Sequence, residues 1–199
     1  MANANSAFGL RPVRYLGGAP YNGAVNTYIA PASYATNMFI GDPVVITGTS
    51  SVGTTGGAYA QINVATAGAT NQITGVIVGF EPNPSVVSLG YGLASTLRKV
   101  YVCDDPTVLF EIQEDSVGGN IAAASVGLNA NLVSGTGSTF TKRSGWMLDS
   151  STVAADATFQ LIVRGFVDRV ENDAVTDSFA KALVSINLHT NRYGAVAGL

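Results

Sequence analysis

The sequence predicts a mainly β protein, an antiparallel β-barrel or sandwich with short helices, an extended N-terminal arm and a C-terminal tail. Three observations predict this class. Short segments rich in β-branched and aromatic residues recur from Pro43 onward, clusters of Gly, Pro, Asn and Asp separate them, and helix signals are weak throughout. The chain has 199 residues, enough for one domain with appendages and a sizeable core.

The strand pattern is carried by a series of short segments. They are PVVIT (43–47), ITGVIVGF (73–80), KVYVC (99–103), TVLFEI (107–112), TFQLIVRGFV (158–167) and ALVSINLH (182–189). Many short strands with turn signals between them, and no long helix, favour a closed or nearly closed antiparallel sheet.

Two turns are predicted from residues suited to chain reversal. CDDPTVLF (103–110) is interpreted as a hairpin whose turn is the DDP triplet. LVSGTGSTF (132–140) is interpreted as a second hairpin, in which Gly135 and Gly137 supply positive φ angles. A short strand and turn are expected over 145–153.

Helical structure is expected only in short pieces. One turn is expected around 121–124, and residues 33–40 form either a helical turn or a loop. A short helix is possible over 176–184, with Thr176 or Asp177 as its N-cap.

The Gly-rich stretch GTSSVGTTGG (48–57) lacks the lysine of a phosphate-binding loop. It is therefore interpreted as a flexible connection.

The chain is divided into an extended N-terminal arm and entry segment (1–40), a β-rich core domain (41–190) and a C-terminal tail (191–199). Pro and Gly at short intervals oppose a helix in the arm. Ordering some 15 arm residues costs on the order of 15–30 kcal/mol of backbone entropy. Burying its large apolar side chains contributes only roughly 10 kcal/mol. We therefore expect the arm to be mobile alone and to order on a partner that adds backbone hydrogen bonds.

The arm supplies the candidate interface residues, with a disordered terminus of no function as the alternative. Its large apolar side chains would pack against another protein subunit. Its arginines would bind carboxylates there, since a guanidinium can form two hydrogen bonds to one carboxylate. These candidates are Phe8, Leu10, Arg11, Arg14, Tyr15, Leu16 and Tyr21.

Composition narrows the functional classes. Charged residues make up 12% of the chain, the net charge is −3 and no cluster of Lys and Arg occurs, so direct binding of nucleic acid is not expected. No charged residue lies between Asp42 and Glu81, but Gly and Asn interrupt every apolar run there, so no membrane span is expected. Cys103 is the only cysteine and is expected in a half-buried strand.

Catalytic signatures are sparse, and neither a cofactor nor a metal site nor an enzymatic activity is expected. The chain has one histidine, His189, and no G-x-S-x-G motif. His189 is interpreted as a structural residue at a strand end, with a catalytic or ligand role as the alternative. A carboxylate-based hydrolase around Glu111 and Asp115 is the remaining enzymatic hypothesis, against turn residues and a solvated strand end.

Several segments in order resemble one family. MANANSAFGLRPVRYLGG, GDPVVITG, ITGVIVGF, VGLNANLV and the closing VSINLH…YG are similar to the capsid decoration, or cement, proteins of tailed bacteriophages. The resemblance implies a β-rich virion protein on the outer surface of the capsid, made in the host cytoplasm, that bridges neighbouring major capsid subunits and uses its arm as a clamp. The family brings no catalytic residues. Many of its members are shorter than this chain.

A decoration protein of this kind is expected to act as a symmetric homo-oligomer, a trimer over a local threefold axis or else a dimer. The alternative function is a phage tail, fibre or surface-adhesion β domain that binds carbohydrate. In that case Trp146, Tyr91 and Tyr101 would stack on sugars, although Trp146 also suits a core or an interface.

Overall fold

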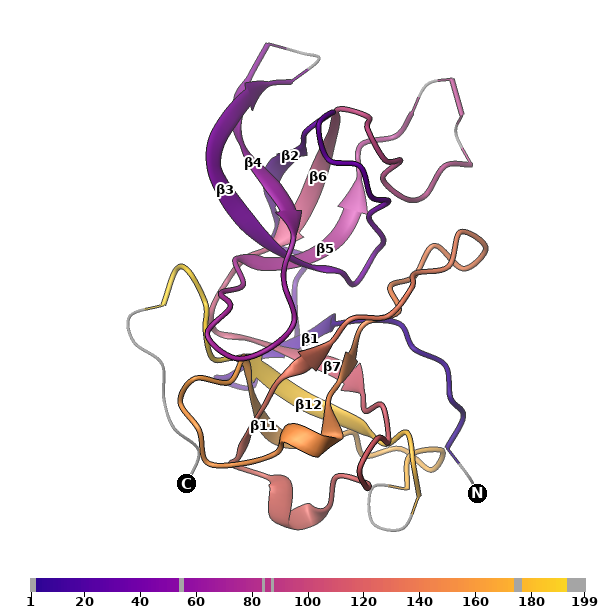
Figure 1. The fold of residues 1–199 in the computed structure, drawn as a ribbon, viewed down its shortest axis with the longest axis vertical. Helices are drawn as coiled ribbons and strands as arrows, with labels where there is room; N and C mark the ends of the chain where they lie inside the picture. The colour runs from indigo at the N-terminus through magenta and orange to yellow at the C-terminus, as the bar shows by residue number, and fades with distance from the viewer. Residues whose placement is uncertain (1–2, 54–55, 84, 87, 174–176, 193–199) are drawn as a thin grey trace.

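The structure is a computed structural model that describes residues 3–53, 56–83, 85–86, 88–173 and 177–192. Figure 1 shows two β units stacked along the long axis, a barrel above and a sheet below. The predicted class, a mainly β protein with antiparallel sheets and little helix, is confirmed.

The upper unit is a closed barrel in the order β2-β4-β3-β5-β6. Its strands are β2 (Asn26–Ala30), β3 (Pro43–Val52), β4 (Ala58–Val64), β5 (Gly75–Phe80) and β6 (Arg98–Cys103). Neighbouring strands run antiparallel except β2 and β4, which pair in parallel at Ile29 and Gln61 and close the barrel. Inward-facing Val44, Ile62 and Val100 are fully buried and fill it.

The lower unit is an antiparallel sheet in the order β1-β7-β12-β11-β8. Its strands are β1 (Arg11–Tyr15), β7 (Val108–Gln113), β12 (Lys181–Ile186), β11 (Leu161–Phe166) and β8 (Asn129–Ala130). Beside it, β9 (Leu132–Val133) pairs with β10 (Met147–Leu148). Short 3₁₀ turns occupy Ala123–Ser125 and Ser150–Thr152, and the side chain of Asp149 caps the second by accepting from the Ser151 N–H.

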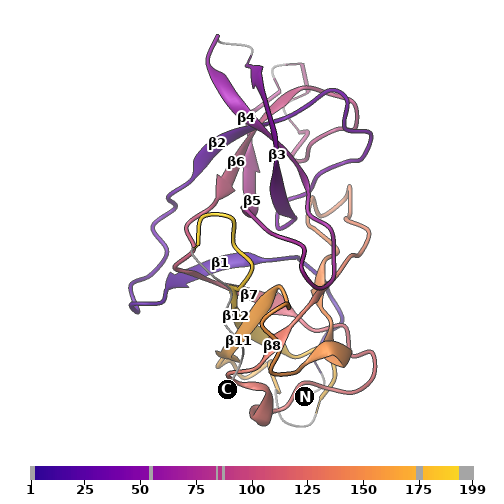
Figure 2. The same ribbon diagram turned by 60° about the vertical axis from the view of Figure 1, so that its left-hand side comes forward.

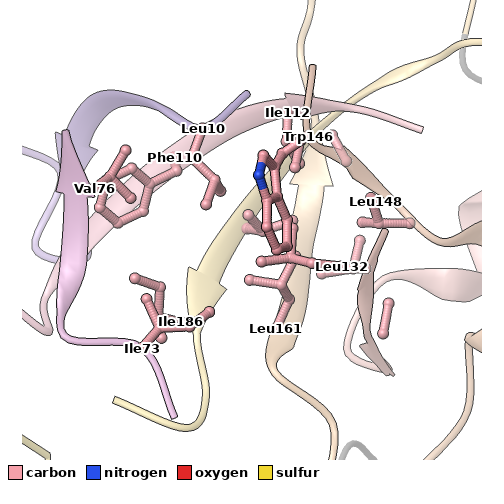
Figure 3. Packing of buried hydrophobic residues seen from close by; sticks show 14 of the residues in the cluster. Leu10, Ile73, Val76, Phe110, Ile112, Leu132, Trp146, Leu148, Leu161 and Ile186 are labelled. Atoms are coloured by element: carbon pink, nitrogen blue, oxygen red, sulfur yellow. The ribbon is translucent and has the colours of Figure 1, made fainter. Parts of the chain in front are cut away.

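One hydrophobic core joins the two units. Figure 3 shows Ile73 and Val76, from the base of the barrel, on the same side of the cluster as Phe110 of β7. All six residues of β7 are buried, because the strand lies between β1 and β12 and under the barrel. The two units are therefore fixed to each other by packing.

The N-terminal region is extended in backbone but is not an arm separate from the core. β1 pairs with β7 of its own chain, and β2 is a strand of the barrel. The expected mobility of this region is wrong for its described part, because the backbone hydrogen bonds assigned to an outside partner come from β7 and β6. The tail residues 193–199 lie outside the described residues.

The DDP turn does not form the predicted hairpin. β6 pairs with β2 and β5 in the barrel, whereas β7 pairs with β1 and β12 in the lower sheet. Residues 104–107 therefore carry the chain from one unit to the other. A turn signal ends a strand, but it does not say which sheet the next strand joins.

Two other local predictions also fail. Residues 48–57 were expected as a flexible connection, but β3 runs to Val52 and pairs with β4, with Ser50 opposite Ala60. The short helix expected over 176–184 is replaced by β12 from Lys181 onward, and Thr176 lies outside the described residues. The turn near 121–124 is confirmed as the 3₁₀ turn Ala123–Ser125.

Candidate functional site

The second half of β1 and the connection to β2 form a projecting hairpin, residues 13–25. Figure 2 shows it swinging away from the body of the molecule. The Tyr15 N–H donates to the Ala19 carbonyl at 2.8 Å, and the Tyr21 N–H donates to the Val13 carbonyl at 3.0 Å. Gly18 has a φ of +88°, the left-handed conformation that its tight turn requires. The hairpin is thus held in shape by its own chain.

The first predicted interface residues, Phe8, Leu10 and Arg11, all contact their own chain. Leu10 is 1% exposed and belongs to the core that joins the two units. Arg11 lies 5.2 Å over the ring of half-buried Phe8 and forms an ion pair of 2.5 Å with Glu111 of β7. The carboxylate that Arg11 was expected to find on a partner is therefore present in the same chain.

Two predicted aromatic residues brace the hairpin. The rings of Tyr15 and Tyr21 lie 6.2 Å apart. The Tyr15 hydroxyl donates to the Asn22 side chain at 2.8 Å, and the Tyr21 hydroxyl donates to the Ala24 carbonyl at 2.7 Å. Burial raises the pKa of the Tyr21 hydroxyl, with a smaller contribution from neighbouring Cys103. Both tyrosines stabilise the loop from inside.

Of the predicted set, Arg14 and Leu16 are exposed on this hairpin, and Arg11 is partly exposed beside its ion pair. The predicted set did not include Val13 and Val25, which are exposed on the same hairpin. A register shift between Pro12 and Arg14 turns neighbouring side chains outward together. We define the hairpin patch as Val13, Arg14, Leu16 and Val25, whose apolar members are 36%, 49% and 39% exposed. No local signal marks the bulge, so strand alternation alone could not find Val13.

A cavity of about 630 Å³ lies between the 34–42 segment of the barrel unit and the 134–139 loop of the lower unit. Figure 1 shows that loop, in orange, rising from the lower sheet beside the barrel. Its lining residues include the aromatic residues Tyr34, Phe39 and Trp146, the threonines Thr36 and Thr139, and one acidic residue, Asp42.

The predicted glycines shape this loop in an unexpected way. Neither Gly135 nor Gly137 has a positive φ, so the prediction of that conformation is wrong. A Cβ at Gly135 would lie 2.0 Å from the Gly145 carbonyl oxygen, and one at Gly137 would lie 2.1 Å from the Phe39 ring. Their role is close approach. The loop of the predicted hairpin is also longer than expected, because β9 pairs with β10, which begins only at Met147.

Asp42 is buried in the cavity wall, only 3% exposed. One of its oxygens accepts the Phe39 N–H at 2.7 Å, and the Ser144 hydroxyl also bonds to the carboxyl. Burial raises the pKa of Asp42 to about 6, against the smaller lowering effect of these hydrogen bonds. Sequence reasoning noted Asp42 only as the start of a charge-free stretch.

The carboxylates of the enzymatic hypothesis have structural partners. Glu111 binds Arg11 and Arg169 through the same oxygen, at 2.5 and 2.7 Å. Asp115 accepts from the Ser150 backbone and hydroxyl, at 3.1 and 3.0 Å. Between them in sequence, Glu114 accepts the N–H groups of Ile121 and Ala180. Each holds loops and strands together.

His189 and Cys103 are buried at the junction of the two units. The His189 Nδ1 accepts the Asn191 N–H at 3.0 Å, and burial lowers the pKa of the ring. Burial raises the pKa of the Cys103 thiol to about 11, which keeps it protonated and unreactive near neutral pH. Cys103 is a strand residue as predicted, although it is fully buried.

The aromatic residues of the carbohydrate hypothesis do not form a common platform. Trp146 is 5% exposed and packs in the core, as its alternative interpretation predicted. The Tyr91 ring stacks on the Phe39 ring with 5.4 Å between the ring centres. The Lys142 ammonium lies over the Tyr91 ring, 5.0 Å from its centre. Tyr101 is half-buried in β6.

Across the described ranges, no group of three or more His, Cys, Asp or Glu side chains is arranged to hold a metal ion. None of the described helical segments has the length and apolar character needed to cross a membrane. Comparison of the chain with protein-family models, curated proteins and solved structures finds no match.

Proposed function

We propose that this chain is a decoration, or cement, protein of a bacteriophage capsid that binds the outer surface of the head and bridges neighbouring major capsid subunits. The observation that carries the proposal is the projecting hairpin, which presents the hairpin patch on a backbone already fixed by its own hydrogen bonds. The order of segments resembling the cement family gives the class of partner.

A pre-formed hairpin suits this role energetically. A partner need not order the loop, so less of the gross contact energy is lost on binding. Each apolar side chain of the patch is already partly buried, so completing its burial contributes about 1 kcal/mol. Arg14 is exposed on the same hairpin and suits a carboxylate of the capsid surface.

Such a patch alone binds weakly, so we propose that several copies act together. A homotrimer over a local threefold axis, or else a dimer, would present equivalent hairpins at once. The second and third contacts are then intramolecular, and the effective concentration multiplies the affinity.

The test uses heads of the phage that encodes the chain. Heads lacking the protein should release their genome at lower temperature than complete heads, and re-addition should restore the difference. Equal robustness of depleted and complete heads would contradict the proposal.

The attachment site is tested by the double variant Arg14→Glu, Leu16→Glu, which should bind depleted heads much more weakly while keeping its fold. Val170→Glu is the matched control, because Val170 is 93% exposed on a different loop. Full occupancy by the double variant would exclude the hairpin patch as the contact.

A further inference from the structure

The described residues that line the cavity beside the 134–139 loop include an acidic residue but no basic residue. Its volume of about 630 Å³ falls among those of small-molecule sites, roughly 300–1,000 Å³. The wall is formed by one acidic residue, three aromatic residues and several threonines, among others. No Lys, Arg or His belongs to this wall as far as the chain is described.

The carboxyl of Asp42 has donors but no counter-ion. It accepts from the Phe39 N–H and the Ser144 hydroxyl. Among the described residues no cation forms an ion pair with it. Buried charges in proteins are normally paired, so an ionised Asp42 leaves an uncompensated charge in the wall.

This arrangement discriminates between classes of ligand. An anion would be repelled by the carboxylate and would find no positive group in the wall. A neutral ligand would leave the charge uncompensated. A cation would neutralise it, and aromatic faces attract cations further. The apolar surfaces of Val64 and Phe39 would accept the stem on which the cation is carried.

We propose that this cavity binds an organic cation, an ammonium or guanidinium group on an apolar stem, with Asp42 as its counter-ion. A free alkylamine and a lysine or arginine side chain of another protein share this chemistry. The inference does not depend on the proposed function.

Calorimetric titration of the full chain with n-butylamine and n-butylguanidine, against neutral 1-pentanol, tests the proposal. The cations should bind at least about tenfold more tightly than the alcohol. Because the pKa of Asp42 is about 6, only about a tenth of the carboxyls are ionised at pH 5, so the affinity there should be about tenfold lower than at pH 8. Tyr34, whose pKa is raised, stays neutral over this range.

Two variants locate the site. Asp42→Asn should lower the affinity for butylamine at least about tenfold. Ala35→Phe keeps Asp42 but narrows the cavity from an exposed position in its wall, and should also reduce binding. If Asp42→Asn does not fold, Ala35→Phe and the pH series decide. Equal binding of alcohol and amines, or unchanged binding by either folded variant, would overturn the proposal.

Titration with N-acetyl-lysine methylamide, which carries a lysine side chain on a blocked backbone, distinguishes a side chain of another protein from a free small amine. Affinity equal to that of butylamine indicates a side chain carried on a polypeptide, whereas binding of the free amine alone indicates a small molecule. Both results support a cation site. Absence of binding of every cation at about 10 mM would overturn it.

Discussion

The Arg11 guanidinium donates to the buried carboxylate of Glu111 at 2.5 Å and thereby fastens β1 to β7. Arg169, from the segment after β11, binds the same Glu111 oxygen at 2.7 Å. The side chain of Glu111 is only 1% exposed, whereas both arginines are about two-fifths exposed. One interior charge is thus compensated from two separate segments.

This shared compensation predicts non-additive effects. Replacing Arg11 or Arg169 by Met should lower the free energy of unfolding by about 1 kcal/mol, because the other arginine still neutralises Glu111. The double replacement should cost about 3 kcal/mol or more, since it leaves a buried carboxylate uncompensated. Urea unfolding of the four proteins measures the coupling. Simple additivity would mean that the arginines act independently.

Leu10 tests whether the N-terminal region belongs to the core. Leu10→Ala should lower the free energy of unfolding by about 2–5 kcal/mol, because it opens a cavity among fully buried side chains. Leu16→Ala, at a half-exposed position, should change it by less than about 0.5 kcal/mol. If chemical denaturation showed equally small effects for both variants, Leu10 would not be part of the core and the expectation of a mobile arm would stand.

Asp42 predicts a pH dependence. Its pKa is raised from 3.8 to about 6 in the folded chain, so between these values the folded state holds more protons than the unfolded state. Its contribution to stability therefore falls as pH rises through this window, by up to about 3 kcal/mol. As the pH rises from 4 to 7, the free energy of unfolding of the wild type should therefore fall relative to that of the Asp42→Asn variant. A constant difference would contradict this assignment.

His189 predicts the opposite slope. Burial lowers the pKa of the ring below 6.5, with Asp104 and Asp105 opposing this shift and Arg192 adding to it. Below pH 6.5 the unfolded state therefore binds more protons, and stability is lost as the solution is acidified. Thermal unfolding between pH 7 and pH 5 should show a smaller loss in His189→Gln than in the wild type. Parallel profiles would show that His189 does not control this slope.

Gly135 tests the close approach that shapes the cavity. Gly135→Ala places a methyl group 2.0 Å from the Gly145 carbonyl oxygen, so the loop must move at a cost of about 1–3 kcal/mol or more. The fluorescence of Trp146, the one tryptophan, should shift because it follows Gly145. Gly165→Ala is the control, since nothing lies within 4 Å of its added methyl. Identical spectra and melting temperatures for both variants would contradict the close packing.

Sequence alone located six of the strands, β3, β5, β6, β7, β11 and β12, but not β1, β2 or β4. The segment 43–47 and the others rich in β-branched residues lie in strands because side-chain shape and burial favour that backbone locally. Sequence also limited the chemistry available, with one histidine, one cysteine and few charges. These properties depend on composition and on neighbours within a few residues.

Tertiary structure alone decided the partners of each strand and side chain. β1 was missed because Pro12 and nearby glycines oppose regular structure, yet pairing with β7, about a hundred residues away, orders it. The same long-range packing buries Leu10, directs Arg11 to Glu111 and brings Asp42 beside the 134–139 loop. Pairing energies between distant segments settle these arrangements, and no local pattern in the chain encodes them.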